Sequence, residues 1–147
     1  MLHGFRMSYE GGIHMYDRNS VTSFQNVFLN RSMNGIRMYD RYLITGATGF
    51  LGRAVSQKLA SCSISVRALV LSNDPYAEQL PKGVQRVTGD VLDKESLEAF
   101  FDGSGIHTCV IHCAGIVSVA SNPDPIIYTV NVEGTNNIIC KCREHNV

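Results

Sequence analysis

Three glycines, Gly46, Gly49 and Gly52, follow a short apolar run at residues 42–45, and the last of them lies at the beginning of a helical pattern that starts at Phe50. Glycine loses more backbone entropy on folding than other residues, so a glycine cluster between two regular elements indicates that another group approaches the main chain closely. A phosphate group is the favoured candidate, because the first amides of a helix are unpaired and carry partial positive charge. A glycine-rich turn without a ligand is the alternative interpretation.

Short apolar runs and helical patterns alternate along the chain from residue 41 onwards. Strands are predicted at residues 42–45, 64–71, 84–88 and 108–112, and helices at residues 50–60, 75–80, 93–101 and 124–143. Asp93 is the expected N-cap of the third helix, with Ser96 in its first turn. Alternation at this spacing predicts βαβ units with right-handed crossovers, and therefore an α/β fold around a parallel sheet.

The helix predicted at residues 50–60 has one apolar face, made of Phe50, Leu51, Ala54, Val55 and Leu59. Because the three glycines follow a strand and open this helix, they stand in the setting of a dinucleotide-binding turn. In that setting the first glycine permits the tight turn and the second lets the backbone approach the pyrophosphate. The third glycine permits close packing of the helix against the strand.

Composition limits the function classes. The chain has 147 residues, 44% of them hydrophobic, and 13 basic and 13 acidic side chains give a formal net charge of zero. A neutral chain lacks the positive field that nucleic acid or an acidic membrane surface requires, so neither is expected as a partner. No run of about eighteen apolar residues is present, so no membrane span is predicted. A single domain that binds a small molecule is the favoured interpretation.

The five cysteines are odd in number, and reduced thiols in a cytoplasmic protein are the expected state. The pair Cys140 and Cys142 lacks the two-residue gap of common zinc ligands, and no second pair has matching spacing. No metal site is therefore predicted.

Residues 1–40 show neither strand nor helix periodicity and are rich in Ser, Asn, Gly, Arg and Met. We expect an irregular or disordered leader, or an upstream start outside the natural domain. An organelle transit peptide is the alternative, because the segment is rich in Arg and poor in acidic residues. The folded domain is predicted at residues 41–147.

Four motifs occur in order along the domain. The spacing Gly-x-x-Gly-x-x-Gly after Thr45 is followed by Gly-Asp-Val at 89–91, Ile-His-Cys-Ala-Gly at 111–115 and Asn-Val-Glu-Gly-Thr at 131–135. Together they resemble the extended branch of the short-chain dehydrogenase/reductase superfamily, which includes NAD-dependent epimerases, dehydratases and dihydroflavonol-reductase-like enzymes. The resemblance implies a Rossmann-type, doubly wound parallel sheet with the strand order 3-2-1-4. In this sequence the sheet is expected to be truncated after the fourth strand and its following helix.

The glycine pattern and the resemblance together predict a cofactor site. The resemblance implies that Asp90 and the following amide contact adenine, and that residues 113–115 lie beside the ribose and pyrophosphate. The predicted site comprises Gly46, Thr48, Gly49, Phe50, Leu51, Gly52, Ser72, Asn73, Asp90, Val91, Cys113, Ala114 and Gly115. Structural roles compete at three positions: Asp90 could begin a turn, His112 could be a satisfied core histidine, and Asn131 is interpreted as architectural.

The choice between NAD and NADP depends on the end of the second strand, where an acidic residue favours NAD and an arginine favours NADP. By count, the family's charged position falls near Val70 and Leu71, and neither carries a charge. Ser72 and Asn73 can bond either ribose form. Asp74 lies slightly late and is as well explained as the start of a turn. NAD is therefore weakly preferred over NADP, since no obvious cationic side chain follows the second strand to bind a 2′-phosphate.

The family's catalytic Tyr-x-x-x-Lys pair is absent, because no tyrosine of this sequence has a lysine four residues later. No catalytic residue is predicted, and the chain is interpreted as the N-terminal, NAD(P)-binding portion of an oxidoreductase or epimerase. The resemblance implies a hydroxyl or keto substrate in the full-length parent, of nucleotide-sugar or dihydroflavonol type. A non-catalytic NAD(P)-binding sensor and an inactive truncated product remain alternatives. The unpaired edge of the fourth strand predicts self-association.

Overall fold

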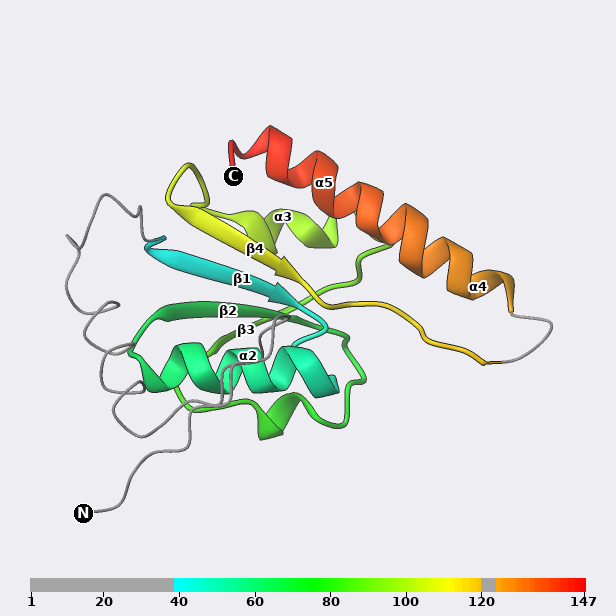
Figure 1. The fold of residues 1–147 in the computed structure, drawn as a ribbon. Coiled ribbons are helices and arrows are strands. Elements are labelled where there is room, and N and C mark those ends of the chain that lie inside the picture. The colour runs from blue at the N-terminus through cyan, green and yellow to red at the C-terminus, as the bar shows by residue number, and fades with distance from the viewer. Residues whose placement is uncertain (1–38, 120–123) are drawn as a thin grey trace, which may run out of the picture. The chain divides into compact units, whose positions relative to one another are not determined.

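The computed structural model describes residues 39–119 and 124–147, so nearly all of the predicted leader lies outside the described residues. In this part of the chain the sheet is parallel, with the strand order β3-β2-β1-β4. The strands are β1 (Arg41–Thr45), β2 (Ser65–Val70), β3 (Gln85–Thr88) and β4 (Thr108–His112). Figure 1 shows them side by side with their carboxyl ends at one edge. The predicted doubly wound parallel sheet is confirmed.

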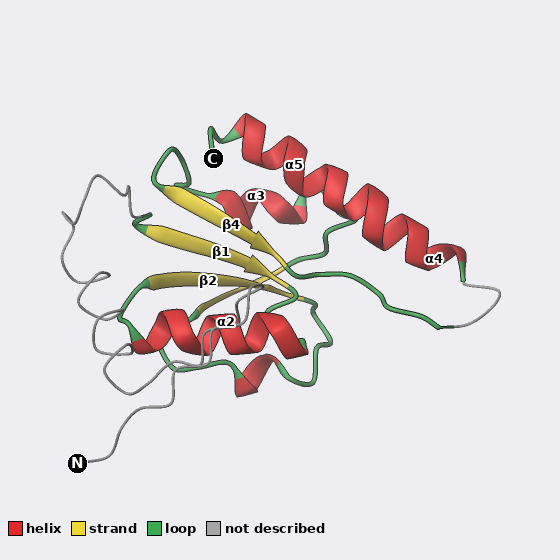
Figure 2. Ribbon diagram, in the orientation of Figure 1, coloured by secondary structure: helices red, strands yellow, loops and turns green. Residues whose placement is uncertain are grey.

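Helices cover both faces of the sheet. Figure 2 shows the helix α2 (Phe50–Ser61) on one face, and α3 (Ser96–Phe101) and α5 (Thr135–Glu144) on the other. Three short elements complete the described set: the 3₁₀ turn η1 (Ala77–Gln79), the helix α4 (Pro125–Tyr128) and the π-helical turn η2 (Thr129–Gly134). None of the described helices is long and apolar enough to cross a membrane.

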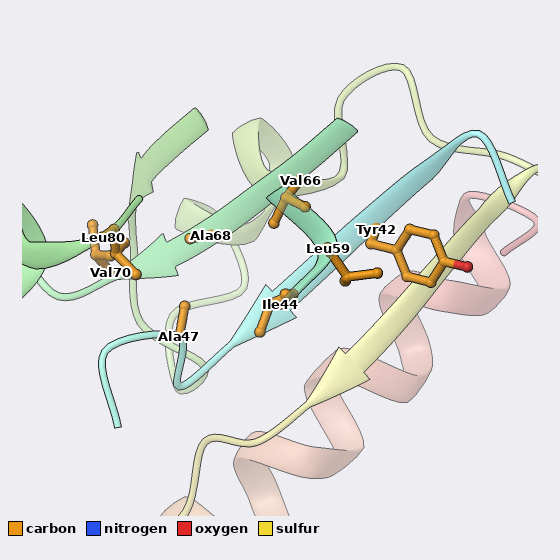
Figure 3. Packing of buried hydrophobic residues seen from close by; sticks show 8 residues of the cluster. All are labelled: Tyr42, Ile44, Ala47, Leu59, Val66, Ala68, Val70 and Leu80. Carbon is orange, nitrogen blue, oxygen red and sulfur yellow. The ribbon is translucent and has the colours of Figure 1, made fainter. Parts of the chain in front are cut away.

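Two apolar clusters fill the space between the sheet and its helices. The cluster on the α2 face is drawn in Figure 3 and includes Ile44, Leu59 and Val66. The cluster on the α3 and α5 face includes Leu43, Leu97 and Phe100. Successive residues of a strand point to opposite faces, so β1 supplies both clusters. Burial on two faces explains why residues 42–44 read as an uninterrupted apolar run.

The predicted apolar face of α2 is wrong at Phe50, Leu51 and Ala54, which are exposed. Phe50 is 95% exposed and Leu51 is 61% exposed, whereas the buried residues of the helix are Gly52, Ser56 and Leu59. The backbone of the helix lies so close to the glycine turn that only small residues fit at the contact. The helix therefore buries the small residues Gly52 and Ser56, which were not part of the predicted face, and Phe50 and Leu51 face away.

The third helix begins later than predicted, at Ser96. Asp93 is not its N-cap, which is Glu95, but the Asp93 carboxylate still accepts hydrogen bonds from the amides of Glu95 and Ser96, at 3.0 and 3.3 Å. The capping interaction is thus made by a turn that precedes the helix. The helix predicted at residues 75–80 is also shorter, and it is the 3₁₀ turn η1.

The long helix predicted at residues 124–143 is interrupted by a wider turn. Asp124 is the N-cap of α4, where its carboxylate accepts a hydrogen bond from the amide of Ile126 at 2.9 Å. The π-helical turn η2 then separates α4 from α5. Such turns insert one extra residue into a helix and often occur at functional sites.

Candidate functional site

The glycine turn joins the end of β1 to the start of α2. Gly46 has a φ of +62°, and a Cβ placed there would lie 2.6 Å from the backbone of Cys113 and Ala114. The amide of Gly49 donates to the carbonyl of Gly46 at 3.1 Å, and a Cβ on Gly52 would overlap that same carbonyl. The first and third glycines are therefore required by the geometry. Gly49 is the N-cap of α2 and offers no side chain to the amides of its first turn.

A cavity of about 340 Å³ opens beside this turn, at the carboxyl ends of β1, β2 and β4. Carboxyl ends of parallel strands are where ligands bind in open α/β sheets. The cavity is lined from the glycine turn, from the ends of β2 and β3, and from the segment after β4. Eight predicted site residues line it: Gly46, Thr48, Gly49, Asp90, Val91, Cys113, Ala114 and Gly115.

A second hollow, of about 700 Å³, continues from the first past Thr48 and Asp74, which line both. It contains the predicted residues Phe50, Ser72 and Asn73, together with Arg53. The two remaining predicted residues line neither hollow. Leu51 has an exposed side chain, and Gly52 is buried beneath the turn. Any ligand contact of theirs would therefore involve the amides at the start of α2.

Asp74 has a role at the site that the sequence interpretation left out. The Thr48 hydroxyl donates to one oxygen of the Asp74 carboxylate at 2.6 Å, and the amide of Tyr76 donates to the other at 2.9 Å. This carboxylate therefore connects the end of β2 to the glycine turn. Asp74 is the first acidic residue after β2, and this signal could have placed it in the predicted site together with Ser72 and Asn73.

Two arginines near β2 have different surroundings. Arg53 lines the second hollow and donates to the side-chain oxygen of Gln79 at 2.7 Å. Arg67 is buried, and its guanidinium donates to the carbonyls of Phe100 and Asp102 at 2.9 and 2.7 Å. Because its guanidinium is engaged by these carbonyls, Arg67 is not placed to bind a phosphate in either hollow.

Asp90 makes the turn considered for it and also lies at the first cavity. Its carboxylate accepts from the amide of Leu92 at 2.9 Å, and its own amide donates to the Ser96 hydroxyl at 3.0 Å. These bonds form the turn that leads towards α3. Asp90 also lines the first cavity, so the turn holds it at the wall of that cavity.

The wall opposite the glycine turn is formed by the segment after β4. The amides of Cys113 and Ala114 each donate to the Thr45 hydroxyl at 3.2 Å. The side-chain amide of Asn131, in η2, accepts from the amide of Ile116 at 2.8 Å and donates to its carbonyl at 2.9 Å. The architectural interpretation of Asn131 fits this pair of bonds. Burial raises the pKa of the Cys113 thiol, so this wall is uncharged.

The fold, the glycine turn and the four motifs identify an extended short-chain dehydrogenase/reductase, related to NAD-dependent epimerases and dehydratases. More narrowly, residues 43–147 match the 3-beta hydroxysteroid dehydrogenase/isomerase family, and the chain belongs to it. The chain is 37% identical over 108 residues to 3 beta-hydroxysteroid dehydrogenase type 7 of Homo sapiens. It is 33% identical over 100 residues to 2-alkyl-3-oxoalkanoate reductase of Shewanella oneidensis.

These alignments cover 69% and 68% of this chain but only 28% and 24% of the two relatives. Solved structures agree. UDP-glucose 4-epimerase of Thermus thermophilus in complex with NAD is 33% identical with a TM-score of 0.62, and the match covers 71% of this chain and 34% of the epimerase. The epimerase of Brucella ovis in complex with NAD is 26% identical with a TM-score of 0.63, covering 72% of this chain and 33% of the epimerase. The chain therefore spans about a third or less of these proteins.

Proposed function

We propose that this chain is the nicotinamide-dinucleotide-binding portion of an oxidoreductase or epimerase. The observation that carries the proposal is the glycine turn, which brings the uncapped start of α2 to the cavity lined by Gly46, Gly49 and Ala114. A Cβ at Gly46 would collide with the cavity's opposite wall, and a Cβ at Gly49 would meet only the carbonyl of Gly46, at 3.3 Å. The absence of side chains on the turn therefore leaves space in which a diphosphate can bind.

In the proposed complex the pyrophosphate binds at the start of α2, on the amides of Phe50 and Leu51. Adenine binds against Asp90 and Val91, and the adenosine ribose reaches Ser72 and Asn73 in the second hollow. The nicotinamide half lies along Cys113, Ala114 and Gly115. When bound, the cofactor supplies hydride transfer. This chain's residues bind and orient the cofactor, and the substrate is proposed to be a hydroxyl or ketone compound handled by the longer parent protein.

We propose NAD rather than NADP as the preferred form. The Asp74 carboxylate borders both hollows, and a 2′-phosphate entering the second hollow would meet its negative charge. Arg53 lines the same hollow and is the one competing attraction among the described residues that line it. Replacing the carboxylate by a neutral amide, Asp74→Asn, is expected to raise the affinity for NADP relative to NAD by about tenfold. Arg53→Gln in the same background is expected to reverse that gain.

Titration calorimetry with NAD⁺ and NADP⁺, supported by thermal unfolding, tests the proposal. Saturable binding at micromolar cofactor and a higher unfolding temperature are expected. Absence of binding at millimolar concentrations of either cofactor would contradict the proposal and favour an inactive truncated product. We also expect this polypeptide alone to show no turnover, because it lacks the Tyr-x-x-x-Lys pair. Tight binding with no catalysis in the longer parent would instead favour the sensor alternative.

A cytoplasmic location is proposed as well. It is supported by the five cysteines, all of which are free thiols in the structure. Disulfides persist in oxidising compartments and are rare in the cytosol.

A further inference from the structure

His112 lies at the carboxyl end of β4, directly before the cavity wall. The parallel register pairs His112 with Thr45, so the two side chains stand next to each other on the sheet face that α5 covers. The residue after Thr45 is Gly46, which opens the glycine turn, and the residue after His112 is Cys113, which opens the wall. The contact between Thr45 and His112 thus connects the start of the glycine turn to the start of the opposite cavity wall.

The hydrogen bonds around the imidazole assign its protons. The Thr135 hydroxyl donates to the carbonyl of Asn131 at 2.7 Å, so it accepts from Nε2 of His112, which lies 3.0 Å away. With the proton on Nε2, the neutral ring has a lone pair on Nδ1. That atom accepts from the Thr45 hydroxyl at 2.6 Å. The network therefore selects the neutral Nε2–H tautomer.

The Thr45 oxygen is fully used in this arrangement. Its hydrogen goes to the ring, and its two lone pairs accept from the amides of Cys113 and Ala114 at 3.2 Å each. A proton added to Nδ1 would bring a third donor to an oxygen with two lone pairs, and the hydroxyl hydrogen would lose its acceptor. The amide of Cys113 would keep a second bond, to the Thr45 carbonyl at 3.1 Å, so the amide of Ala114 is the one whose bond to Thr45 depends on the hydroxyl.

No charged side chain among the described residues offsets this cost. Burial of the ring is the cause of the shift that lowers the pKa of His112. The elements packed against the ring are β1, η2 and α5. Their described charged residues form no hydrogen bond or ion pair with the imidazole. These residues are Arg41, Glu133, Lys141, Arg143 and Glu144. The thiol beside it, Cys113, is neutral because burial raises its pKa.

The wall has little freedom to move without affecting the glycine turn. A Cβ on Gly46 would lie 2.6 Å from the amide nitrogen of Ala114 and from the carbonyl of Cys113, so the two backbones are in close contact. A shift of the wall is therefore transmitted to the turn. Both surfaces belong to the proposed cofactor site, and the inference that follows rests on that proposed function.

We propose that His112 is a positioning residue of the cofactor site, whose neutral ring holds the Cys113–Ala114 wall through Thr45, and whose protonation loosens the wall and weakens dinucleotide binding. The residue touches neither cofactor nor substrate in this proposal. It acts through the Thr45 hydroxyl, and Thr135 sets the tautomer that makes this action possible.

Calorimetric titration of the full chain with NAD⁺ at about pH 8 and about pH 5 tests the proposal. For the unmodified protein we expect the affinity to fall about tenfold or more at the lower pH. His112→Asn retains an acceptor for Thr45 but cannot titrate, so its affinity is expected to change about threefold or less over the same range. His107→Asn is the matched control, because His107 is an exposed histidine in the turn directly before the same strand. It is expected to keep the full pH dependence.

Nitrogen NMR of the His112 ring in the unmodified protein gives a second test that needs no variant. A neutral Nε2–H tautomer at about pH 8 is expected, with a titration midpoint that coincides with the loss of affinity. A pH dependence in His112→Asn equal to that of the unmodified protein would overturn the proposal, as would the opposite tautomer. Absence of NAD⁺ binding at about pH 8 would instead contradict the proposed function itself.

Discussion

At the scale of single residues, the site depends on places where a side chain is impossible and on places where one hydroxyl serves several partners. Gly46 is the first kind, because its φ is positive and its Cβ position is occupied by the opposite wall. Thr45 is the second kind, with bonds to the His112 ring and to two amides. Neither requirement comes from apolar burial, so both mark the geometry of the site.

Gly46→Ala tests the first requirement. The substitution adds a clash with the Cys113–Ala114 backbone to the strain of a positive φ, and we expect at least tenfold weaker NAD⁺ binding and a clear loss of stability. Gly83→Ala is the matched control, since Gly83 also has a positive φ but has nothing within 4 Å of its Cβ position. That control is expected to lose about 1 kcal/mol and to keep its cofactor affinity. Equal effects of both substitutions on binding would contradict the assigned role of Gly46.

Arg67 illustrates a charged residue used for stability. It is 7% exposed, and its guanidinium donates to carbonyls at the carboxyl end of α3 and to Gln85. Arg67→Met leaves the carbonyl of Phe100 without this donor and the carbonyl of Asp102 with Arg41 alone, so the free energy of unfolding is expected to fall by about 2–3 kcal/mol in urea denaturation. Arg86→Met is the control, because Arg86 is exposed in its pair with Glu78 and no measurable change is expected. An unchanged free energy of unfolding in Arg67→Met would contradict this role and indicate that water replaces the guanidinium as donor to the carbonyls.

At the scale of elements, the sequence predicted the order and type of most strands and helices because period and glycine placement are local signals. The errors occur where tertiary contact overrides the local pattern. The first turn of α2 exposes Phe50 and Leu51, since packing against the glycine turn admits only small residues. Asp74 is missing from the predicted site because a turn explains it equally well, and its bond to Thr48, 26 residues away, leaves no mark in a local pattern.

The π-helical turn η2 is not predicted from the sequence, because residues 124–143 are interpreted as one continuous helix. Its contribution is the side chain of Asn131, which bonds both backbone groups of Ile116. Asn131→Ala is expected to speed hydrogen exchange at the Ile116 amide by about tenfold and to weaken NAD⁺ binding, because that segment continues the cavity wall. Asn136→Ala, at an exposed position of α5, is expected to change neither quantity. Unchanged exchange at Ile116 would contradict this role for η2.

At the scale of the whole molecule, the contacts that stabilise the fold and the proposed cofactor site lie at different places. Arg41 and Arg67 bind the backbone around the end of α3, and the two apolar clusters lie on the faces of the sheet. The cavities with the predicted site residues open at the carboxyl ends of the strands. This separation allows substitutions such as Arg67→Met to affect folding while leaving the geometry of the cofactor site unaffected.

Strand β4 forms one edge of the sheet within the described residues. Its full length pairs with β1, and no strand within the described residues pairs with its other side. The last four residues of β4 are half-buried, whereas the last four of β1 are buried. An edge with unpaired backbone groups and apolar side chains is a template for association. The polypeptide of these 147 residues is therefore expected to self-associate through β4.

Sedimentation velocity at roughly 1 to 100 μM provides the measurement, with a sedimentation coefficient that rises with concentration as the expected result. Ile111→Lys places a charge within the β4 edge and is expected to restore a concentration-independent monomer. Val87→Lys makes the same change in β3, the strand at the other edge, and association through β4 predicts that it has no such effect. Circular dichroism checks that both variants remain folded. A monomer at all concentrations, or equal suppression by both lysines, would contradict association through β4, because only a contact made by that strand distinguishes the two edges.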